Sequence, residues 1–477
     1  MTSFENMQIT PPTIITIFGA TGDLSTQKLL PSLFDLFQKR YLPKKFKIVG
    51  FSRQEISNKD YREYAKKAIM AKKTSFSEED LVEFLSHISY AQGFFDKIES
   101  YLELLETLKI KEDEIGQCTN KLFYLAVPPV YYKNIFEHLA QSELMKPCSN
   151  EAGWTRILVE KPFGNNITTA QELDAILGKL FKEEQVFRID HYLAKEVLQD
   201  ILMFRFSNLI FEPLWSKHFI ERVELSLFET RGVEGRGAFF DETGALRDVG
   251  QNHLLQMLAF VATEDPVELD AQHVRAERAR VLKALRPITE ETVCETVVRG
   301  QYDGYLEVPN IASGSQTETY FKIKAFIDNE RWNGVPFYLE SGKALTENKA
   351  EIKVYFKKTE SCLCISEEKS PRQNVLTFRI QPDEGTSVLF WAKKPGLSLE
   401  IEPRELSFSY KGSPEVKPLA DAYEKVLFDG ILGDQMLFTS TEEVSATWHF
   451  ITPILDLWRD TPLHRYKKGS AGPEIVL

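Results

Sequence analysis

The first 190 residues alternate short apolar runs with amphipathic stretches. The run Thr13–Phe18 is β-branched or aromatic at every position and ends at a glycine, which is typical of a strand buried on both faces. Residues Ser25–Gln38 follow with leucine and phenylalanine at helical spacing. Strands separated by helices predict a doubly wound parallel sheet of the Rossmann type. The same alternation predicts a helix at Asp60–Lys73 and strands at Phe46–Phe51, Lys121–Val127, Thr155–Val159 and Gln185–Ile189.

The pattern changes after residue 200, where strand-like runs follow one another with little helix between them, as in an antiparallel sheet. The expected strands are Val223–Thr230, Thr317–Ile327, Glu351–Phe356, Asn374–Gln381 and Leu397–Ile401. Helical spacing flanks them at Asp248–Thr263, Asp265–Leu285, Asp421–Leu432 and Thr441–Trp458. We therefore expect an α/β Rossmann-like domain at residues 1–194 and an α+β domain with a large, mainly antiparallel sheet at residues 195–477.

Composition narrows the classes of function. The length of 477 residues predicts two or three domains, and the 43% of hydrophobic residues is typical of a globular protein and excludes wholesale disorder. The net charge of −12 argues against binding to nucleic acid or an anionic membrane, whereas a small phosphate needs only a local cationic cluster. The segment Met1–Pro12 lacks the features of a signal peptide, and no uncharged apolar run reaches the ~18 residues that span a bilayer. A cytoplasmic location is expected.

The five cysteines occur at spacings that do not repeat. Cys362 and Cys364 form a C-x-C pair rather than the C-x-x-C of redox and zinc sites. We expect reduced structural thiols and no metal site.

A glycine-rich segment joins the first expected strand to the first expected helix. Glycine tightens the turn and lets the backbone approach a pyrophosphate, while the helix N-terminus offers free N–H groups. An ordinary strand-to-helix turn produces similar glycines, but its place in the first βα turn of an α/β pattern favours a dinucleotide site. The candidate cofactor residues are Gly19, Ala20, Thr21, Gly22, Asp23 and Leu24.

The end of the second strand distinguishes NAD from NADP. An NAD site usually places an acid there for the ribose 2′-hydroxyl, whereas NADP needs a cation for its 2′-phosphate. Here Ser52 and Arg53 follow the strand, and no acid occurs until Glu55. Arg53 can bind a phosphate bidentately beside the hydroxyls of Ser52 and Thr21, although a solvated surface arginine has the same signature. The pattern favours NADP.

An acid, an imidazole, a phenol and an amine lie within six residues after the strand Gln185–Ile189. His191, Tyr192 and Lys195 can together hold a sugar phosphate. Asp190 can accept a hydrogen bond from another imidazole and fix its tautomer.

Two further clusters carry candidate chemistry. Lys161 lies at the carboxyl end of a strand, where ligands of open α/β sheets bind, and Asp248 and His253 lie at the start of an expected helix. Oxidation of a sugar hemiacetal needs a base with a pKa near neutrality, which suits histidine. The chain has eight histidines, and spacing alone does not select His253 among them.

Several motifs together resemble those of glucose-6-phosphate dehydrogenases, in the same order and spacing. They are GATGDL at 19–24, EKPFG at 160–164, RIDHYLAKE at 188–196, DVGQNH at 248–253, GQY at 300–302, GVP at 334–336, SGK at 341–343 and FITP at 450–453. The resemblance spans nearly the whole chain, and RIDHYLxKE is the most specific motif. It implies oxidation of D-glucose 6-phosphate at C1 to 6-phospho-D-glucono-1,5-lactone with hydride transfer to NADP+, the first oxidative step of the pentose phosphate pathway.

The resemblance also assigns roles to residues. It implies that His253 is the catalytic base and that Asp190 orients it. It implies substrate contacts by Lys161, His191, Tyr192, Lys195, Glu229, Asp248, Lys343 and Gln381, and it places Lys28, Pro128, Tyr132 and Lys161 near the cofactor. A role as a surface or helix-capping residue is a simpler explanation for Glu229 and Asp248. It is strongest for Asp248, which can cap the helix that begins there. A homodimer or a dimer of dimers is the expected assembly.

The chain departs from the family pattern in three places. Asn348 occupies a position that is usually basic, so either the adjacent Lys349 substitutes or phosphate is bound more weakly. The turn after GDL keeps only Lys28 of a usually basic run. The chain lacks the longer tail of eukaryotic members, so we do not expect a second, structural NADP.

Two rival functions are weaker. Another group of sugar oxidoreductases shares the Rossmann domain and an E-K-P strand end but lacks RIDHYLxKE. A catalytically silent NADP sensor should have lost the base or its orienting acid, and both are present here.

Overall fold

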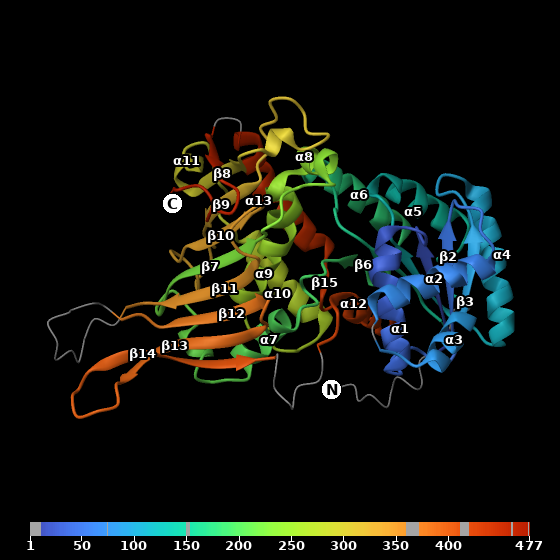
Figure 1. Ribbon diagram of the computed structural model, residues 1–477, viewed down its shortest axis with the longest axis horizontal. Helices are drawn as coiled ribbons and strands as arrows, with labels where there is room; N and C mark the ends of the chain where they lie inside the picture. The colour runs from blue at the N-terminus through green and yellow to red at the C-terminus, as the bar shows by residue number, and fades with distance from the viewer. Residues whose placement is uncertain are drawn as a thin grey trace. The chain divides into compact units, whose positions relative to one another are not determined.

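The computed structural model describes residues 11–73, 75–148, 153–358, 372–410, 419–458, 461–475 and 477. The chain forms two compact units (Figure 1). The first unit consists of Met1–Gly164, Thr168–Ala194 and Ala420–Thr441. The second consists of Asn165–Ile167, Lys195–Leu419 and Glu442–Leu477.

The first unit is built on a seven-stranded sheet in the order β15-β6-β5-β4-β1-β2-β3. Six strands run parallel, and only β15 pairs antiparallel, with β6. The order steps outward from β1 in both directions, so the doubly wound sheet predicted from the sequence is confirmed. The strands are β1 (Thr13–Phe18), β2 (Phe46–Ser52), β3 (Ile88–Gln92), β4 (Asn120–Leu125), β5 (Thr155–Val159), β6 (Val186–Ile189) and β15 (Phe438–Thr439).

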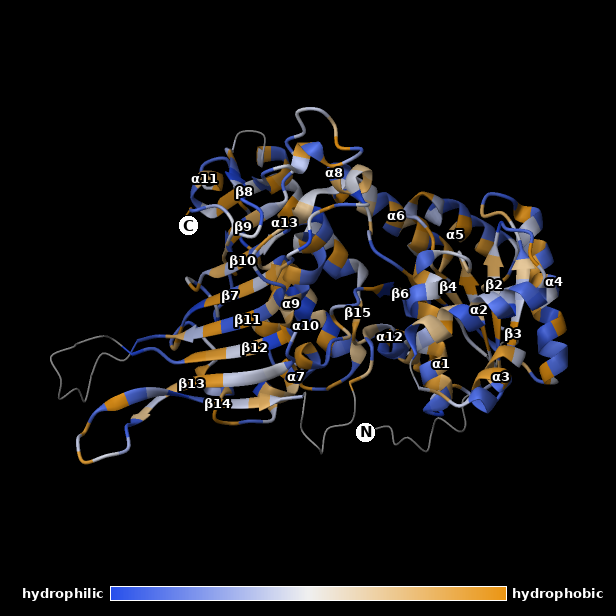
Figure 2. Ribbon diagram, in the orientation of Figure 1, coloured by the Kyte–Doolittle hydropathy of each residue, from blue (hydrophilic) through white to orange (hydrophobic). Residues whose placement is uncertain are grey.

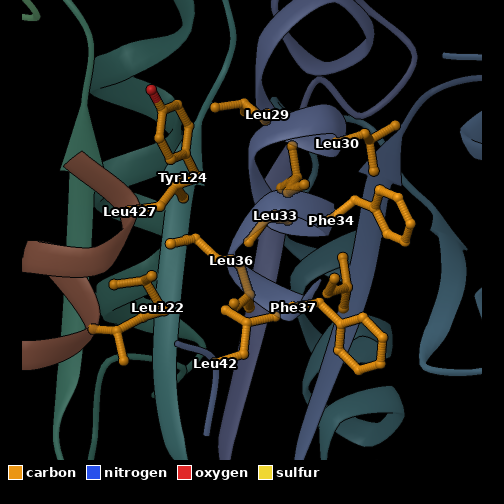
Figure 3. Close-up of a cluster of buried hydrophobic side chains, with 14 of the residues drawn as sticks. Leu29, Leu30, Leu33, Phe34, Leu36, Phe37, Leu42, Leu122, Tyr124 and Leu427 are labelled. Carbon is orange, nitrogen blue, oxygen red and sulfur yellow. The ribbon is translucent and has the colours of Figure 1, made fainter. Parts of the chain in front are cut away.

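Helices of the first unit cover the sheet with their apolar faces, and Figure 2 shows polar and apolar residues alternating along α4 and α5. Leu36 of α1 is buried beside Leu122 of β4 and Leu427 of α12, and Leu33 and Phe37 belong to the same buried cluster (Figure 3). The core therefore includes residues from both ends of the chain. The helices and short helical turns are η2 (Ser25–Leu29), α1 (Leu30–Gln38), α2 (Asn58–Lys72), α3 (Glu78–Ser86), α4 (Ile98–Ile115), η3 (Pro129–Tyr131), α5 (Tyr132–Gln141), α6 (Ile167–Leu180), η4 (Glu183–Gln185) and α12 (Ala422–Leu432).

One expectation about the cysteines is wrong. Cys118 and Cys148 form a disulfide in the first unit, with their Cα atoms 5.9 Å apart. Their separation of 30 residues carries no sequence signal, because a disulfide depends on the fold that brings the two Cα atoms within reach. Cys294 is a free, exposed thiol, and Cys362 and Cys364 lie outside the described residues.

The second unit is built on a nine-stranded sheet in the order β14-β13-β12-β11-β7-β10-β9-β8-β16. Its pairs are antiparallel except β7 with β10 and β8 with β16. This confirms the predicted second sheet. The strands are β7 (Ile220–Phe228), β8 (Val297–Tyr302), β9 (Tyr320–Ala325), β10 (Phe337–Gly342), β11 (Lys349–Phe356), β12 (Val375–Gln381), β13 (Gly385–Lys393), β14 (Ile401–Ser409) and β16 (Leu463–Tyr466).

Helices cover one face of this sheet. Helix α7 packs on β12, and the π-helical segment η6 packs on β7 and β10. Along β12 buried and half-buried residues alternate, as expected of a strand with one covered face. The helices and turns of the unit are α7 (Glu196–Phe206), η5 (Glu212–Leu214), α8 (Gly237–Ala245), η6 (Leu246–Leu254), α9 (Leu255–Ala262), α10 (Ala271–Lys283), α11 (Val293–Thr296), η7 (Tyr305–Glu307) and α13 (Thr441–Leu457). No helix in the described part of the chain is long and apolar enough to cross a membrane.

Two predicted elements of the second unit are wrong in their bounds. The expected strand Leu397–Ile401 is mostly a connection, since β14 begins at Ile401 and Leu397 is fully exposed. The expected helix Asp265–Leu285 begins only at Ala271, because the Asp270 side chain accepts a hydrogen bond from the N–H of His273 and caps the helix there.

Candidate active site

The glycine turn lies at the carboxyl end of β1 in the first unit. Gly19 has a φ of +78°, and its N–H donates to the carbonyl of Phe51 at 2.9 Å. A Cβ at this position would lie 2.2 Å from the carbonyl oxygen of Ala126, so only glycine fits. Residues 20–24 then lead directly into η2. The turn therefore has the tight backbone that a pyrophosphate needs for close approach.

A second turn, at the end of β2, lies beside the first. The hydroxyls of Thr21 and Ser52 are 3.1 Å apart, and Tyr64 donates to the carbonyl of Thr21 at 2.7 Å. The Arg53 side chain is exposed, and within the described residues no carboxylate forms an ion pair with it. A free guanidinium beside two hydroxyls suits a phosphate ester, so these residues fit the 2′-phosphate of NADP.

Lys28 lies close to a helix from late in the chain. Its Nζ atom is 3.5 Å from Oδ2 of Asp421 and 5.6 Å from the ring centre of Tyr423, both at the start of α12. The Tyr423 ring also stacks on His191, with a centroid distance of 6.0 Å and an interplanar angle of 16°. Tyr423 therefore joins a predicted cofactor residue to a predicted substrate residue within the first unit.

Side chains at the carboxyl ends of β4 and β5 form a hydrogen-bonded group with Tyr132 of α5. Tyr124 donates to the Glu160 carboxylate at 2.5 Å, and Tyr132 donates to the Glu160 carbonyl at 2.7 Å. The pKa of Glu160 is raised to about 7, mainly by burial; the hydrogen bond from Tyr124 and the charge of Lys161 oppose this shift, and the charge of Asp190 adds to it. The group holds the strand end that carries Lys161. Pro128 precedes η3, which leads into the helix of Tyr132.

Asp190 and Tyr192 lie in a turn directly after β6. Asp190 is buried, and its Oδ1 atom accepts the backbone N–H of Tyr192 at 3.0 Å. The Asp190 carbonyl accepts the N–H of Leu193 at 3.0 Å. This turn gives Asp190 a single orientation at the carboxyl edge of the sheet, which is where open α/β sheets bind ligands.

His253 lies on η6 in the second unit and is 3% exposed. The buried carboxylate of Glu318 accepts the N–H of Leu246 at 2.9 Å and fixes the start of η6. Near its other end, the amide of Gln251 donates to the Thr447 hydroxyl of α13 at 2.9 Å. Successive turns of a π-helix join residues five apart, so Asp248 and His253 lie on the same side of η6.

Three predicted substrate residues come together beside η6. Lys343 follows β10 and forms an ion pair with Glu229, which follows β7, and its Nζ atom is 3.6 Å from Oδ2 of Asp248. The Lys343 side chain is nearly buried, so this pairing holds its charge in place. Two carboxylates and one ammonium at a helix that carries a histidine can bind and orient several sugar hydroxyls.

The other predicted substrate residues of the second unit lie on different elements. Lys195 precedes α7, with its Nζ atom 3.8 Å from Glu384, and Gln381 ends β12. Asn348 accepts hydrogen bonds from the N–H and hydroxyl of Thr230. Lys349 forms ion pairs with Glu347 and Glu351, at 2.9 and 3.2 Å. At the usually basic position, therefore, the Asn348 amide supports the backbone of Thr230. The charge of the adjacent Lys349 is balanced by two carboxylates.

Sequence reasoning missed three side chains that support these sites. Glu160 is adjacent to Lys161 in EKPFG, so its motif could have indicated it. Glu318 and Tyr423 have no such signal, since they act on residues more than 70 positions away.

Comparisons with known proteins agree over the whole chain. The sequence profile for the glucose-6-phosphate dehydrogenase NAD binding domain matches residues 16–200, and that for the C-terminal domain matches residues 202–476. A glucose-6-phosphate 1-dehydrogenase of Borreliella burgdorferi is 39% identical, with 97% of this chain and 95% of the relative covered. One of Bacillus subtilis is 38% identical, with 97% and 96% covered.

A solved structure gives the same result. A glucose-6-phosphate dehydrogenase in complex with its substrate glucose-6-phosphate superposes with a TM-score of 0.89 at 38% sequence identity, over 97% of this chain and 95% of that one. The chain therefore belongs to the glucose-6-phosphate dehydrogenase family, a family of NADP-dependent oxidoreductases of carbohydrate metabolism.

Proposed function

We propose that the chain oxidises D-glucose 6-phosphate at C1 to 6-phospho-D-glucono-1,5-lactone, as the first oxidative step of the pentose phosphate pathway. NADP+, when bound, supplies the acceptor for the hydride that leaves C1. The C1 hydroxyl loses its proton in the same step, and the protein must take up that proton. The lactone and the reduced cofactor are the products.

His253 is the proposed base. It is buried on a helix whose start and later turns are fixed by Glu318 and Thr447, so its imidazole is held in a defined place. Asp190 is proposed to accept the other imidazole N–H and to stabilise the imidazolium that forms. Both side chains are almost fully buried, which strengthens their electrostatic interaction with charge that develops during the reaction.

Separate groups hold the two ends of the sugar. Glu229, Asp248 and Lys343 bind ring hydroxyls, supported by their joint position beside η6. The 6-phosphate is bound by His191, Tyr192 and Lys195, which supply a ring N–H, a hydroxyl and an ammonium group. Lys161 and Gln381 are further substrate contacts. An acidic protein can thus bind a dianion through one local cationic group.

The cofactor residues are proposed from the two turns of the first unit. Gly19 and the N-terminus of η2 hold the pyrophosphate, and Arg53 holds the 2′-phosphate beside the hydroxyls of Thr21 and Ser52. The remaining proposed contacts are Ala20, Gly22, Asp23, Leu24, Lys28, Pro128, Tyr132 and Lys161. In this scheme the domain of residues 1–194 binds NADP. The domain of residues 195–477 forms the assembly and binds substrate together with Lys161, His191 and Tyr192.

A homodimer or a dimer of dimers is the proposed assembly, in the cytoplasm. Strand β14 is the edge of the nine-stranded sheet, and along it Leu406 and Phe408 are 65% and 49% exposed. An exposed apolar edge strand is an aggregation hazard unless another chain covers it. Sedimentation velocity tests this: the wild type should sediment as a dimer or larger, and a monomer at micromolar concentration contradicts the proposal.

The observation that carries the function is that Lys343 contacts both Glu229 and Asp248, and that Asp248 lies on η6 together with His253. The test is a steady-state assay of reduced nicotinamide absorbance with glucose 6-phosphate. His253→Ala should lower kcat by about 100-fold or more and leave NADP affinity nearly unchanged. An unchanged kcat excludes His253 as the base, and a wild type without activity on glucose 6-phosphate overturns the function.

A further inference from the structure

The turn that carries Arg53 is held by side chains of the neighbouring strand β3. The Tyr90 hydroxyl lies 2.8 Å from the carbonyl oxygen of Ser52 and 2.5 Å from that of Gln54. The Gln92 side-chain amide donates to the carbonyl of Arg53 at 3.2 Å. The single hydroxyl proton of Tyr90 is thus shared by the carbonyls of Ser52 and Gln54, and Gln92 donates to the carbonyl of Arg53 between them.

The backbone of β3 reinforces this contact. Strands β2 and β3 are parallel, with Ser52 opposite Gln92 in the register, and the N–H of Gly93 donates to the Ser52 carbonyl at 3.0 Å. The hydrogen bonds thus continue past the end of β2 into the turn. They fix a segment that would otherwise be a free loop at the edge of the sheet.

The Tyr90 side chain has little freedom to leave this position. It is 8% exposed, and its ring centre is 5.1 Å from that of Tyr61 on α2. Burial raises the pKa of Tyr90 to about 12, so the hydroxyl keeps its proton at neutral and mildly alkaline pH. The hydroxyl is therefore a clamp on the two carbonyls that flank Arg53.

We propose that Tyr90, assisted by Gln92, is a positioning residue that determines the preference for NADP over NAD. The proposal rests on the proposed role of Arg53 at the 2′-phosphate. The Arg53 side chain is exposed, and these contacts fix only its backbone. A fixed backbone lowers the entropy that Arg53 loses when it binds a phosphate, and it holds the Ser52 hydroxyl in place for the same phosphate. NAD has no phosphate at this position, so its binding gains nothing from the clamp.

The main test is Tyr90→Phe, which keeps the ring and removes the clamping hydroxyl. The loss of one hydrogen-bonding group predicts a fall of about fivefold in kcat/KM for NADP. The fall should lie in KM for NADP, with a much smaller loss for NAD and no change in KM for glucose 6-phosphate. Equal losses with both cofactors, or no loss with NADP, overturn the proposal.

Two further variants sharpen the test. In the matched control Tyr101→Phe, another buried tyrosine of the first unit loses a hydroxyl that donates to a backbone carbonyl, that of Phe95 at 2.9 Å. It should leave the ratio of NADP to NAD efficiency unchanged. Gln92→Ala alters an exposed side chain and keeps the proposal testable if Tyr90→Phe fails to fold. It should lower NADP efficiency in the same direction by about twofold.

Arg53→Ala separates this inference from the proposed function. If the wild type shows no preference for NADP, the proposed cofactor role of Arg53 fails together with the clamp. A second outcome rejects the role of Tyr90 and Gln92 alone. In that case the wild type prefers NADP and Arg53→Ala loses this preference, but Tyr90→Phe and Gln92→Ala both keep it.

Discussion

The sharpest test of the second unit is Glu443→Gln in α13. Glu443 and Arg278 of α10 are both fully buried, and their side chains meet at two points. Nε of Arg278 donates to Oε1 at 2.8 Å, and a terminal guanidinium nitrogen donates to Oε2 at 3.3 Å. The amide of the variant keeps one acceptor but removes the negative charge. The Arg278 guanidinium then stays buried and loses the charge of the Glu443 carboxylate.

The expected loss of stability follows from the burial of this ion pair. Breaking a buried ion pair by removing one partner typically costs about 3–5 kcal/mol, because the remaining charge stays desolvated. Because glutamine keeps one hydrogen bond to Arg278, we expect the lower end, about 3 kcal/mol. For a unit of 150–250 residues or more, each kcal/mol lowers the melting midpoint by about 2–4 °C. The expected decrease is therefore about 6–12 °C.

The adjacent residue provides a matched control. Glu442 forms an ion pair with Lys283 of α10 at 2.5 Å, but these side chains are 64% and 56% exposed. Exposed pairs contribute about 0–1 kcal/mol, so Glu442→Gln should lower the midpoint by less than about 4 °C. Differential scanning calorimetry on both variants gives the comparison. A Glu443→Gln midpoint no lower than that of Glu442→Gln refutes the reasoning about burial.

A third variant distinguishes a lost charge pair from lost packing. The double variant Arg278→Met with Glu443→Leu removes both charges and keeps apolar volume. Since a buried pair can be replaced by apolar side chains at little cost, the double variant should recover most of the lost midpoint. A double variant as unstable as Glu443→Gln shows that volume, rather than charge, stabilises this contact.

Three other changes test the first unit and the phosphate site. Burial raises the pKa of Glu160 from its ordinary value of about 4.3 to about 7, so between these values the folded state binds the extra proton. As the pH rises from about 5 to about 8, the thermal midpoint of the wild type should therefore fall relative to that of Glu160→Gln. A difference between the two midpoints that stays constant over this range contradicts the raised pKa. Gly19→Ala puts a Cβ 2.2 Å from the Ala126 carbonyl oxygen, so the turn must shift. The NADP dissociation constant, measured by fluorescence titration, should rise about tenfold or more. Unaltered binding means that the turn does not approach the cofactor. Lys195→Ala should raise KM for glucose 6-phosphate about tenfold or more and hardly change the weak activity on free glucose. An equal loss of activity on free glucose means that Lys195 does not act by binding the phosphate.

Sequence patterns predicted the elements that are buried by their own composition. The run Thr13–Phe18 is a strand at those same bounds, and Thr441–Trp458 is α13 to within one residue. A long helix buried on one face shows a helical period of apolar residues, and a strand buried on both faces shows a continuous apolar run. Both patterns can be recognised in the sequence. Leu397–Ile401 shows the opposite case, because its alternation LSLEI lies in an exposed connection where no core selects the pattern.

Elements that depend on distant partners left no such pattern. Strand β15 has only two residues and exists because it pairs with β6, about 250 residues earlier in the chain. The disulfide between Cys118 and Cys148 likewise depends on the fold. Among the proposed site residues, resemblance to the family motifs identified candidates such as His253 and Lys343. It did not predict the carboxylate of Glu318 that caps η6, because that contact spans 72 residues.

The return of residues 420–441 to the first sheet affects how the chain is made. Phe438 packs edge-to-face on Phe187, with a centroid distance of 4.8 Å, and Ile431 belongs to the same buried cluster. A ribosome adding about 5–20 residues per second completes β6 some 12–50 s before it reaches β15. During that interval the nascent first unit exposes Phe187 and the unpaired edge of β6. A chaperone that binds apolar strand edges has its target there, and a fragment that stops at residue 194 keeps that exposed surface permanently.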